Sequence, residues 1–267
     1  MPRVLCTTDF SPLSEQTVNY AGRLCGAAGF RLTLMNVPSL FPPGGQSVRS
    51  TTPPITTIKE LLASQCVALI ERFQLACDFQ LLESRENLTN TITAYGKDFD
   101  LLVTGIDGEE ALYSSLVDTN AFEVSRRSSV PWLVIPKDCL SRPIASLVHV
   151  FEGERQNDFG LSQLLSFARN IQAKITLLKV TGNHDEVNHD VKMHENSSTA
   201  YSNQEVTFDW LASKQIGDSV NQYMLKGHVD ALAVCSAHRG LLNKLFRGGG
   251  GANISELIHY PLFLFHH

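Results

Sequence analysis

The sequence lacks the patterns that mark several large classes of protein. No apolar run approaches the length of about 18 residues that a membrane-spanning helix needs. The 22 lysines and arginines and 27 acidic residues are spread over 267 residues, with a net charge of -5, so no basic stripe exists that could neutralise a phosphate backbone. We therefore expect neither a membrane nor a nucleic acid as partner. The start, Met1-Pro2-Arg3, leads directly into a short apolar segment without a signal peptide, which predicts a cytoplasmic protein.

Cysteines with the spacing of a metal site or a redox motif are also missing. The six cysteines are scattered, and no Cys-x-x-Cys occurs. Most have apolar neighbours, where a free cysteine behaves as a small hydrophobic residue. We expect structural roles for them rather than redox or metal chemistry. They are Cys6, Cys25, Cys66, Cys77, Cys139 and Cys235.

No set of catalytic residues stands out. Asp9, Ser11 and His149 can be combined into a triad on paper, but no Gly-x-Ser-x-Gly turn is there to present the serine. We therefore predict that the protein is not an enzyme.

Three histidines and several carboxylates crowd the polar stretch His184–Glu195. Imidazole and carboxylate both suit divalent ions, so metal binding there is chemically feasible. The spacing of His184, His189 and His194 does not place all three on one helical face, which favours a solvated excursion without metal.

What the sequence does contain, in its first half, is an alternation of strand and helix patterns. The segments typical of buried strands are Arg3–Thr8, Arg31–Val37, Phe79–Glu83, Leu101–Thr104 and Trp132–Ile135. The segments with helical spacing are Ser11–Gly29, Ile58–Cys77, Asn87–Asp98 and Asn120–Ser128. The segment Phe41–Thr56, with four prolines and two glycines, predicts a loop. This alternation predicts an α/β fold with a parallel, doubly wound sheet.

The second half repeats the strands of the first half in the same order. The matching segments are Arg31–Val37 with Lys174–Val180, Asp100–Thr104 with Asp230–Val234, and Pro131–Ile135 with Pro261–Phe265. Three matches in one order indicate a duplication joined near Asp138–Pro143. We predict two tandem flavodoxin-like, or Rossmann-like, domains at 1–138 and 143–267, each a five-stranded parallel sheet flanked by helices.

Three motifs resemble the universal stress protein family. Val4-Leu-Cys-Thr-Thr-Asp-Phe-Ser11 is similar to that family's first strand with its Thr-Asp-Phe-Ser ending. Asp100-Leu-Leu-Val-Thr-Gly105 resembles the fourth strand, and Ser129-Val-Pro-Trp-Leu-Val-Ile-Pro136 the fifth. The likeness extends over nearly the whole chain as two tandem copies, strong in the first and thin in the second.

The resemblance implies a site for an adenine nucleotide, ATP or AMP, in the first copy. Family members that bind ATP carry Gly-x-x-Gly, nine residues and then Gly-Ser or Gly-Thr after the fourth strand. Glycines let backbone approach phosphate closely, and a helix N-terminus supplies amide donors. A carboxylate after the first strand can hold the ribose, and the backbone after the second meets the adenine. The implied contacts here are Asp9, Phe10, Val37, Gly105, Gly108, Thr119 and Asn120.

Asp118 stands where the family has the glycine that meets phosphate. Its carboxylate would repel a triphosphate, and its Cβ would obstruct close approach. Asp118, Thr119 or Asn120 can instead cap the following helix, and Asn120 with Glu123 has the spacing of a capping box. The first copy thus holds either a working nucleotide site or a weakened, unoccupied one.

The second copy has drifted further from the family pattern. Cys235-Ser-Ala-His238 replaces Gly-x-x-Gly, and Gly248–Gly251 follows nine residues later. Four glycines can wrap an anion through their amides or serve as a flexible connector. Nearby His238, Arg239 and Lys244 add positive charge. We interpret this copy as degenerate.

The fifth strands, Trp132–Ile135 and Leu262–Phe265, are apolar throughout. Such a strand either pairs along an exposed edge or lies in a core. In the resembled family subunits associate through this strand, which implies an intramolecular pseudo-dimer or a homodimer. The sequence favours a stress-response protein that acts by binding; the alternatives are a ligand-free interaction scaffold with decayed sites and, less favoured, a slow ATPase.

Overall fold

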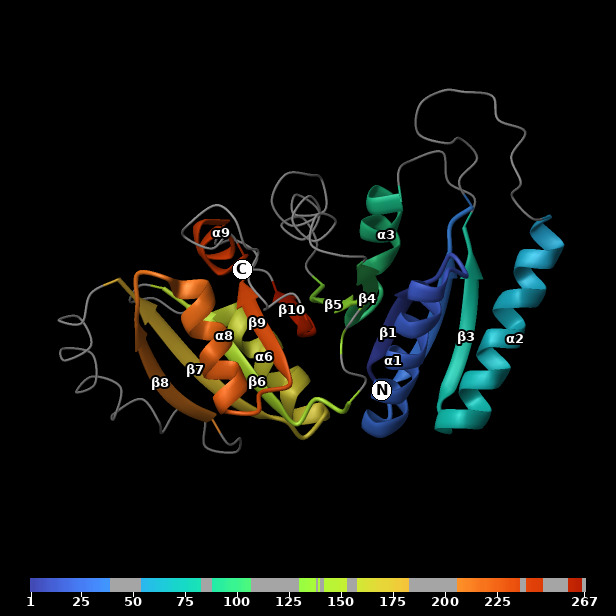
Figure 1. Cartoon of the computed structure of the whole chain (residues 1–267). Coiled ribbons are helices and arrows are strands. Elements are labelled where there is room, and N and C mark those ends of the chain that lie inside the picture. The colour runs from blue at the N-terminus through green and yellow to red at the C-terminus, as the bar shows by residue number, and fades with distance from the viewer. Residues whose placement is uncertain are drawn as a thin grey trace, which may run out of the picture. The chain divides into compact units, whose positions relative to one another are not determined.

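Strands and helices alternate along the chain, as the sequence predicts (Figure 1). The computed structural model describes residues 1–38, 54–82, 88–106, 130–137, 139, 142–152, 158–182, 206–235, 239–246 and 259–265. These residues form two compact units, Met1–Gly105 and Ile106–His267, which are described here one at a time.

The first unit is built on parallel strands. They are β1 (Arg3–Thr7), β2 (Arg31–Asn36), β3 (Ala76–Leu81) and β4 (Leu101–Ile106), in the order β3-β2-β1-β4. β1 pairs in parallel with both β2 and β4, and β2 pairs in parallel with β3. The carboxyl ends of these strands therefore lie at one edge of the sheet, the upper edge in Figure 1. The middle of β1 and the first half of β4 are apolar and buried, as expected when helices cover a parallel sheet.

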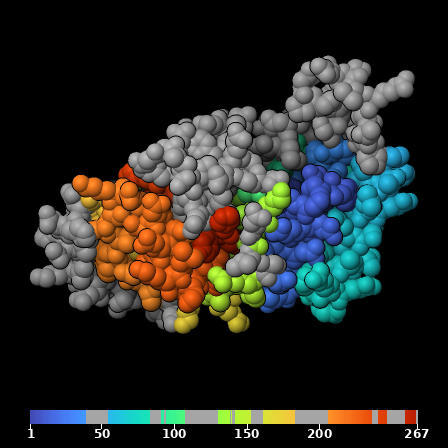
Figure 2. Space-filling view, in the orientation of Figure 1, coloured from blue at the N-terminus to red at the C-terminus, as the bar shows by residue number. Residues whose placement is uncertain are grey.

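Among the residues described for this unit, three helices accompany the sheet: α1 (Pro12–Ala28), α2 (Ile55–Phe73) and α3 (Leu88–Gly96). Ser11 caps α1, since its side chain accepts a hydrogen bond of 3.2 Å from the Ser14 N–H. α1 lies close to α2 because Gly22 presents no side chain: a Cβ there would come within 2.7 Å of Leu69 Cδ2. The outer face of α2, in cyan in Figure 2, exposes Leu61, Val67 and Ile70.

The second unit holds a larger sheet in the order β5-β10-β9-β6-β7-β8. Its strands are β5 (Trp132–Pro136), β6 (Ser146–Phe151), β7 (Lys174–Thr181), β8 (Val206–Ala212), β9 (Ala231–Cys235) and β10 (Leu262–Phe265). Its helices are α6 (Asp158–Asn170), α8 (Ile216–Lys226) and α9 (Arg239–Phe246). All the strand pairs are parallel except β5 with β10, which is antiparallel. The two fifth strands that the sequence identified therefore pair with each other.

The strand order β8-β7-β6-β9 in the second unit repeats the order β3-β2-β1-β4 in the first. A detail at the amino ends repeats as well. The Asp100 carboxylate accepts from the Arg3 N–H at 2.7 Å, and the Asp230 carboxylate accepts from the Ser146 N–H at 3.0 Å. In both places the residue before the fourth strand of a set binds the start of the first strand. The α/β fold class is confirmed.

One boundary differs clearly from the sequence prediction. We expected a helix over Ile58–Cys77 and a strand over Phe79–Glu83, but α2 ends at Phe73 and Cys77 lies within β3. The helix ends at Gln74, whose φ of 55° is left-handed and whose N–H donates to the Ile70 carbonyl. No glycine marks this helix end, so the pattern of apolar residues predicted a helix that continued beyond it. α2 also begins at Ile55, inside the loop expected over Phe41–Thr56.

The other predicted strands and helices agree with the described ones to within about two residues. The helix expected at Asn120–Ser128 and most of the loop expected at Phe41–Thr56 lie outside the described residues.

Candidate functional site

A cavity of about 180 Å³ lies at the carboxyl ends of β1, β2 and β4 in the first unit. Because β2 and β4 lie on opposite sides of β1, this is where the strand order reverses, and open α/β sheets bind ligands at such a position. The lining comes from the three strand ends and the first turn of α1: Thr7, Thr8, Asp9, Ser11, Leu13, Ser14, Met35, Asn36, Val37 and Gly105.

Hydrogen bonds around Thr8 hold the turn between β1 and α1. Its N–H donates to the Met35 carbonyl at 2.9 Å, and its hydroxyl donates to Ser14 Oγ at 3.3 Å. The Phe10 N–H donates to the same Thr8 hydroxyl at 3.3 Å, and Phe10 has a φ of 63°. Left-handed backbone is unfavourable for a bulky residue, so the turn carries local strain beside the cavity.

Asp9 is an exposed carboxylate at this turn, and Asp9 Oδ1 accepts the Ser11 N–H at 3.0 Å. Partial burial acts to raise its pKa, but hydrogen bonds from Ser11 and Ser14 outweigh that effect and hold the pKa below its usual value of 3.8. The group is therefore ionised at neutral pH. An ionised carboxylate at a cavity edge accepts hydrogen bonds from hydroxyl groups or binds a cation.

Asn36, at the end of β2, contributes a polar group that the sequence analysis missed. Its side-chain Nδ2 donates to the Thr8 carbonyl at 2.7 Å, while its buried Oδ1 has no hydrogen-bond partner among the described residues. A buried acceptor without a donor costs free energy, so a ligand N–H or O–H here would be stabilising. The signal in the sequence was an asparagine at the end of a strand, directly after the apolar Leu34 and Met35.

Gly105, near the end of β4, has a structural reason to be glycine. A Cβ at this position would overlap the Thr17 hydroxyl and lie 3.2 Å from Leu13 Cγ. Both of these residues belong to α1, so the bare backbone lets α1 approach β4. This reason is independent of any phosphate.

The structure brings three of the sequence-predicted residues to one cavity lining: Asp9, Val37 and Gly105. Phe10 adjoins Asp9 but is not among the lining residues. Gly108, Thr119 and Asn120 lie outside the described residues, as does Asp118.

The corresponding strand end in the second unit is occupied by an ion pair. Glu152 directly follows β6, and its Oε1 accepts from Lys244 Nζ of α9 at 2.6 Å. In the first unit, by contrast, no lysine or arginine among the described residues forms an ion pair with Asp9. In the second unit, therefore, the Glu152 carboxylate is neutralised by a lysine of the same chain. Gly248–Gly251 lies outside the described residues.

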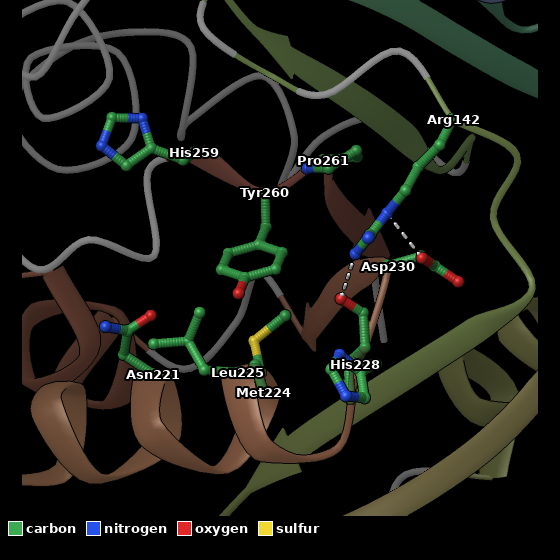
Figure 3. A pocket seen from close by; sticks show the side chains of 10 residues that line it. Arg142, Asn221, Met224, Leu225, His228, Asp230, His259, Tyr260 and Pro261 are labelled. Carbon is green, nitrogen blue, oxygen red and sulfur yellow. Dashed lines mark hydrogen bonds and ion pairs between the residues drawn. The ribbon is translucent and has the colours of Figure 1, made fainter.

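A second cavity, of about 280 Å³, lies at the amino ends of β9 and β10 (Figure 3). Arg142 points toward Asp230 there, with Nε 2.8 Å from Oδ1, and also donates to the Val229 carbonyl at 3.1 Å. Asp230 Oδ2 accepts from the Ala145 N–H at 2.9 Å. These charges hold the start of β6 to the start of β9. This edge is opposite to the one where α/β sheets bind ligands.

Within the described part of the chain, no helix has the length and hydropathy to cross a membrane. The same residues contain no group of three or more histidine, cysteine or acidic side chains placed to hold a metal ion. The stretch His184–Glu195 lies outside them.

Solved structures share this fold over the full chain. A universal stress protein from Archaeoglobus fulgidus DSM 4304 matches with a TM-score of 0.70 and 13% identity, covering 99% of this chain and 98% of that one. A functionally unknown protein from Pseudomonas aeruginosa PAO1 matches with a TM-score of 0.59 and 9% identity, covering 100% and 92%.

The cytoplasmic domain of a prokaryotic cation chloride cotransporter matches with a TM-score of 0.55 and 12% identity, covering 98% and 94%. No protein-family model and no curated protein sequence matches the chain. The fold expected from the sequence motifs is therefore confirmed. Because a transporter domain shares it, the function must be argued from the site.

Proposed function

We propose that this chain is a tandem universal stress protein, with copies at 1–138 and 143–267, that binds an adenine nucleotide in the first copy. It acts in the cytoplasm by binding rather than by catalysis. The observation that carries the proposal is the pair of polar groups at the strand-order reversal. Asp9 and Asn36 line the same cavity. The Asp9 carboxylate is ionised, the Asn36 Oδ1 has no hydrogen-bond partner among the described residues, and both atoms can accept hydrogen bonds.

These acceptors suit the sugar and the base of a nucleotide. In our proposal Asp9 accepts from a ribose hydroxyl, and Asn36 Oδ1 accepts from the exocyclic amino group of adenine. Val37, at the lip of the cavity, contacts the base. The phosphates extend toward the segment after β4, where the sequence places Gly108, Thr119 and Asn120.

Isothermal titration calorimetry with AMP and ATP tests the proposal on the variant Asp9→Asn. The variant keeps the shape of the side chain and removes its charge, so we expect binding to weaken about 10- to 100-fold, the value of a charged hydrogen bond.

Asp100→Asn is the matched control. Asp100 is also exposed and also accepts one backbone N–H, at 2.7 Å, but it lies at the amino end of β4. It should leave affinity unchanged. Absence of heat and of any thermal shift at millimolar AMP or ATP would overturn the proposal.

A ligand-free interaction scaffold is the second candidate. The observation in its favour is the Lys244–Glu152 ion pair, which occupies the strand end of the second copy with the chain's own groups. If the first copy has decayed as well, the chain would act through contacts with other proteins alone. In that case Asp9→Asn would not change the binding of a partner protein. It would also not change the melting temperature measured in the presence of nucleotide.

A further inference from the structure

Two cysteines that are eleven positions apart in the sequence meet between α2 and β3. Cys66 lies on α2 and Cys77 on β3, and their Sγ atoms are 3.3 Å apart. Both are free thiols. Cys66 is 5% exposed, and Cys77 is half-buried, so one side of the pair faces solvent.

The position of the pair is fixed by well-formed structure. The left-handed Gln74 turns the chain sharply after α2, so β3 runs back along the helix. β3 is held in parallel register by β2, with Cys77 opposite Leu32. Cys66 Sγ also donates to the Asp78 carbonyl at 3.3 Å. A disulfide requires the two sulfurs to approach to about 2.05 Å, a small movement from this starting point.

Within the pair, Cys66 differs chemically from Cys25 and Cys139. A hydrogen bond from the Cys77 thiol lowers the pKa of Cys66, an effect that exceeds the opposing effects of burial and of the nearby Asp78 charge. Burial raises the pKa of Cys25 to about 12 and that of Cys139 to about 11. Because the thiolate is the nucleophile, we expect Cys66 to react faster than Cys25 or Cys139.

We propose that Cys66 and Cys77 form a redox modification site, which a peroxide converts to an intramolecular disulfide. This proposal does not depend on nucleotide binding.

The reaction proceeds in two steps. The Cys66 thiol releases its proton to solvent, and the thiolate attacks one peroxide oxygen. The O–O bond breaks, and the released alkoxide or hydroxide takes up that proton from solvent. Cys66 is then a sulfenic acid. The Cys77 sulfur attacks the Cys66 sulfur, the S–O bond breaks, and the hydroxide leaves as water with the Cys77 proton. The two sulfurs lose two electrons, and the peroxide is reduced to an alcohol, or to water, plus a water molecule.

Peptide mapping of the full-length protein tests this directly. Trypsin cleaves after Lys59, Arg72 and Arg85, so Cys66 and Cys77 fall in separate peptides, 60–72 and 73–85. The reduced, folded protein is treated with hydrogen peroxide, and its remaining thiols are alkylated in denaturant before digestion. We expect the two peptides to be joined, with a loss of about 2 Da for the two hydrogens, and the protein to stay monomeric on a non-reducing gel.

Three variants sharpen the result. Cys77→Ser removes the resolving sulfur, so dimedone, which traps sulfenic acid, should label Cys66 at least about tenfold more than in the native chain. Cys66→Ser should leave Cys77 at least about tenfold less reactive. Cys139→Ser, the matched control, should form the 60–72 to 73–85 link at the native rate. Separate peptides after peroxide treatment of the native chain, or a link between two chains, would overturn the proposal.

Discussion

The end of α1 illustrates how one backbone angle controls a residue's identity. Gly29 has a φ of 69°, and its N–H donates to the Cys25 carbonyl. A Cβ there meets nothing within 4 Å, so Gly29→Ala isolates the backbone cost. We expect a loss of about 1 kcal/mol in the free energy of unfolding, measured by urea denaturation.

Gly240→Ala is the control for this prediction. Gly240 also has open space around it, but it lies in α9 and no positive φ is found for it. Alanine favours the helix, so this variant should be neutral or more stable by up to about 1 kcal/mol. Equal losses in both variants would contradict the argument from the backbone.

Asp9 links stability to pH. Hydrogen bonds lower its pKa in the folded chain, so its contribution is fully present above the usual value of 3.8 and is lost as the pH falls through the lower, folded value. Asp9→Asn should remove this part of the acid dependence. Because the group is largely exposed, we expect a difference of only a few tenths of a kcal/mol, about the worth of a solvent-screened interaction. Urea titrations at neutral pH and below pH 4 measure it. A variant that retains the native acid slope would contradict the assignment.

Asp118, outside the described residues, supports a prediction about phosphate. It stands where the resembled family has a glycine, and its carboxylate repels phosphate charge. Asp118→Gly should therefore strengthen binding of ATP about tenfold or more while changing adenosine binding little. Calorimetry with both ligands checks this; equal gains for both would locate the residue away from the phosphates.

The close packing of α1 against β4 depends on two residues, Gly105 and Thr17. Gly105→Ala would force its new Cβ onto the Thr17 hydroxyl, and overpacking of this kind costs about 1–3 kcal/mol. Thr17→Ala removes that obstacle. The double variant should therefore be more stable than the sum of the single losses predicts, with a coupling of at least about 1 kcal/mol in a double-mutant cycle. Additive losses would mean that the two residues do not compete for space.

The elements that the sequence predicted well are those whose ends carry residues typical of helix or strand termini. α1 has a serine cap, a proline in its first turn and a glycine after its last residue, and both of its ends were predicted to within one residue. The end of α2 was wrong because Gln74 takes a left-handed conformation that tertiary packing imposes without a glycine. Placing Cys77 in a helix also hid its contact with Cys66.

The site was predictable only in part. A carboxylate after β1 and a residue after β2 follow from motif position, and Asp9 and Val37 do line the cavity. Asn36 was missed because its importance depends on which hydrogen-bond partners its amide nitrogen and oxygen have in the fold. The spacing of residues in the sequence does not show those partners. Gly105 stays a predicted nucleotide contact, and its packing against α1 is a further reason for glycine that the motif does not show.

In the tandem arrangement that we propose, β5 is the last strand of the first copy and β10 the last strand of the second, and these two strands pair with each other. Leu133 lies opposite Phe263 in this antiparallel pair, and every residue of both strands is buried. Cutting the chain between the copies therefore exposes an apolar strand edge on each fragment, and such an edge pairs with another strand.

We expect residues 1–138, expressed alone, to form a dimer or aggregate, and to combine one to one with residues 143–267 when the two are mixed. The intact chain should be a monomer, because its two fifth strands already satisfy each other. Size-exclusion chromatography with light scattering distinguishes these states. A fragment 1–138 that stays monomeric at high micromolar concentration would show that β5 needs no partner strand, and the tandem arrangement would then need another physical reason.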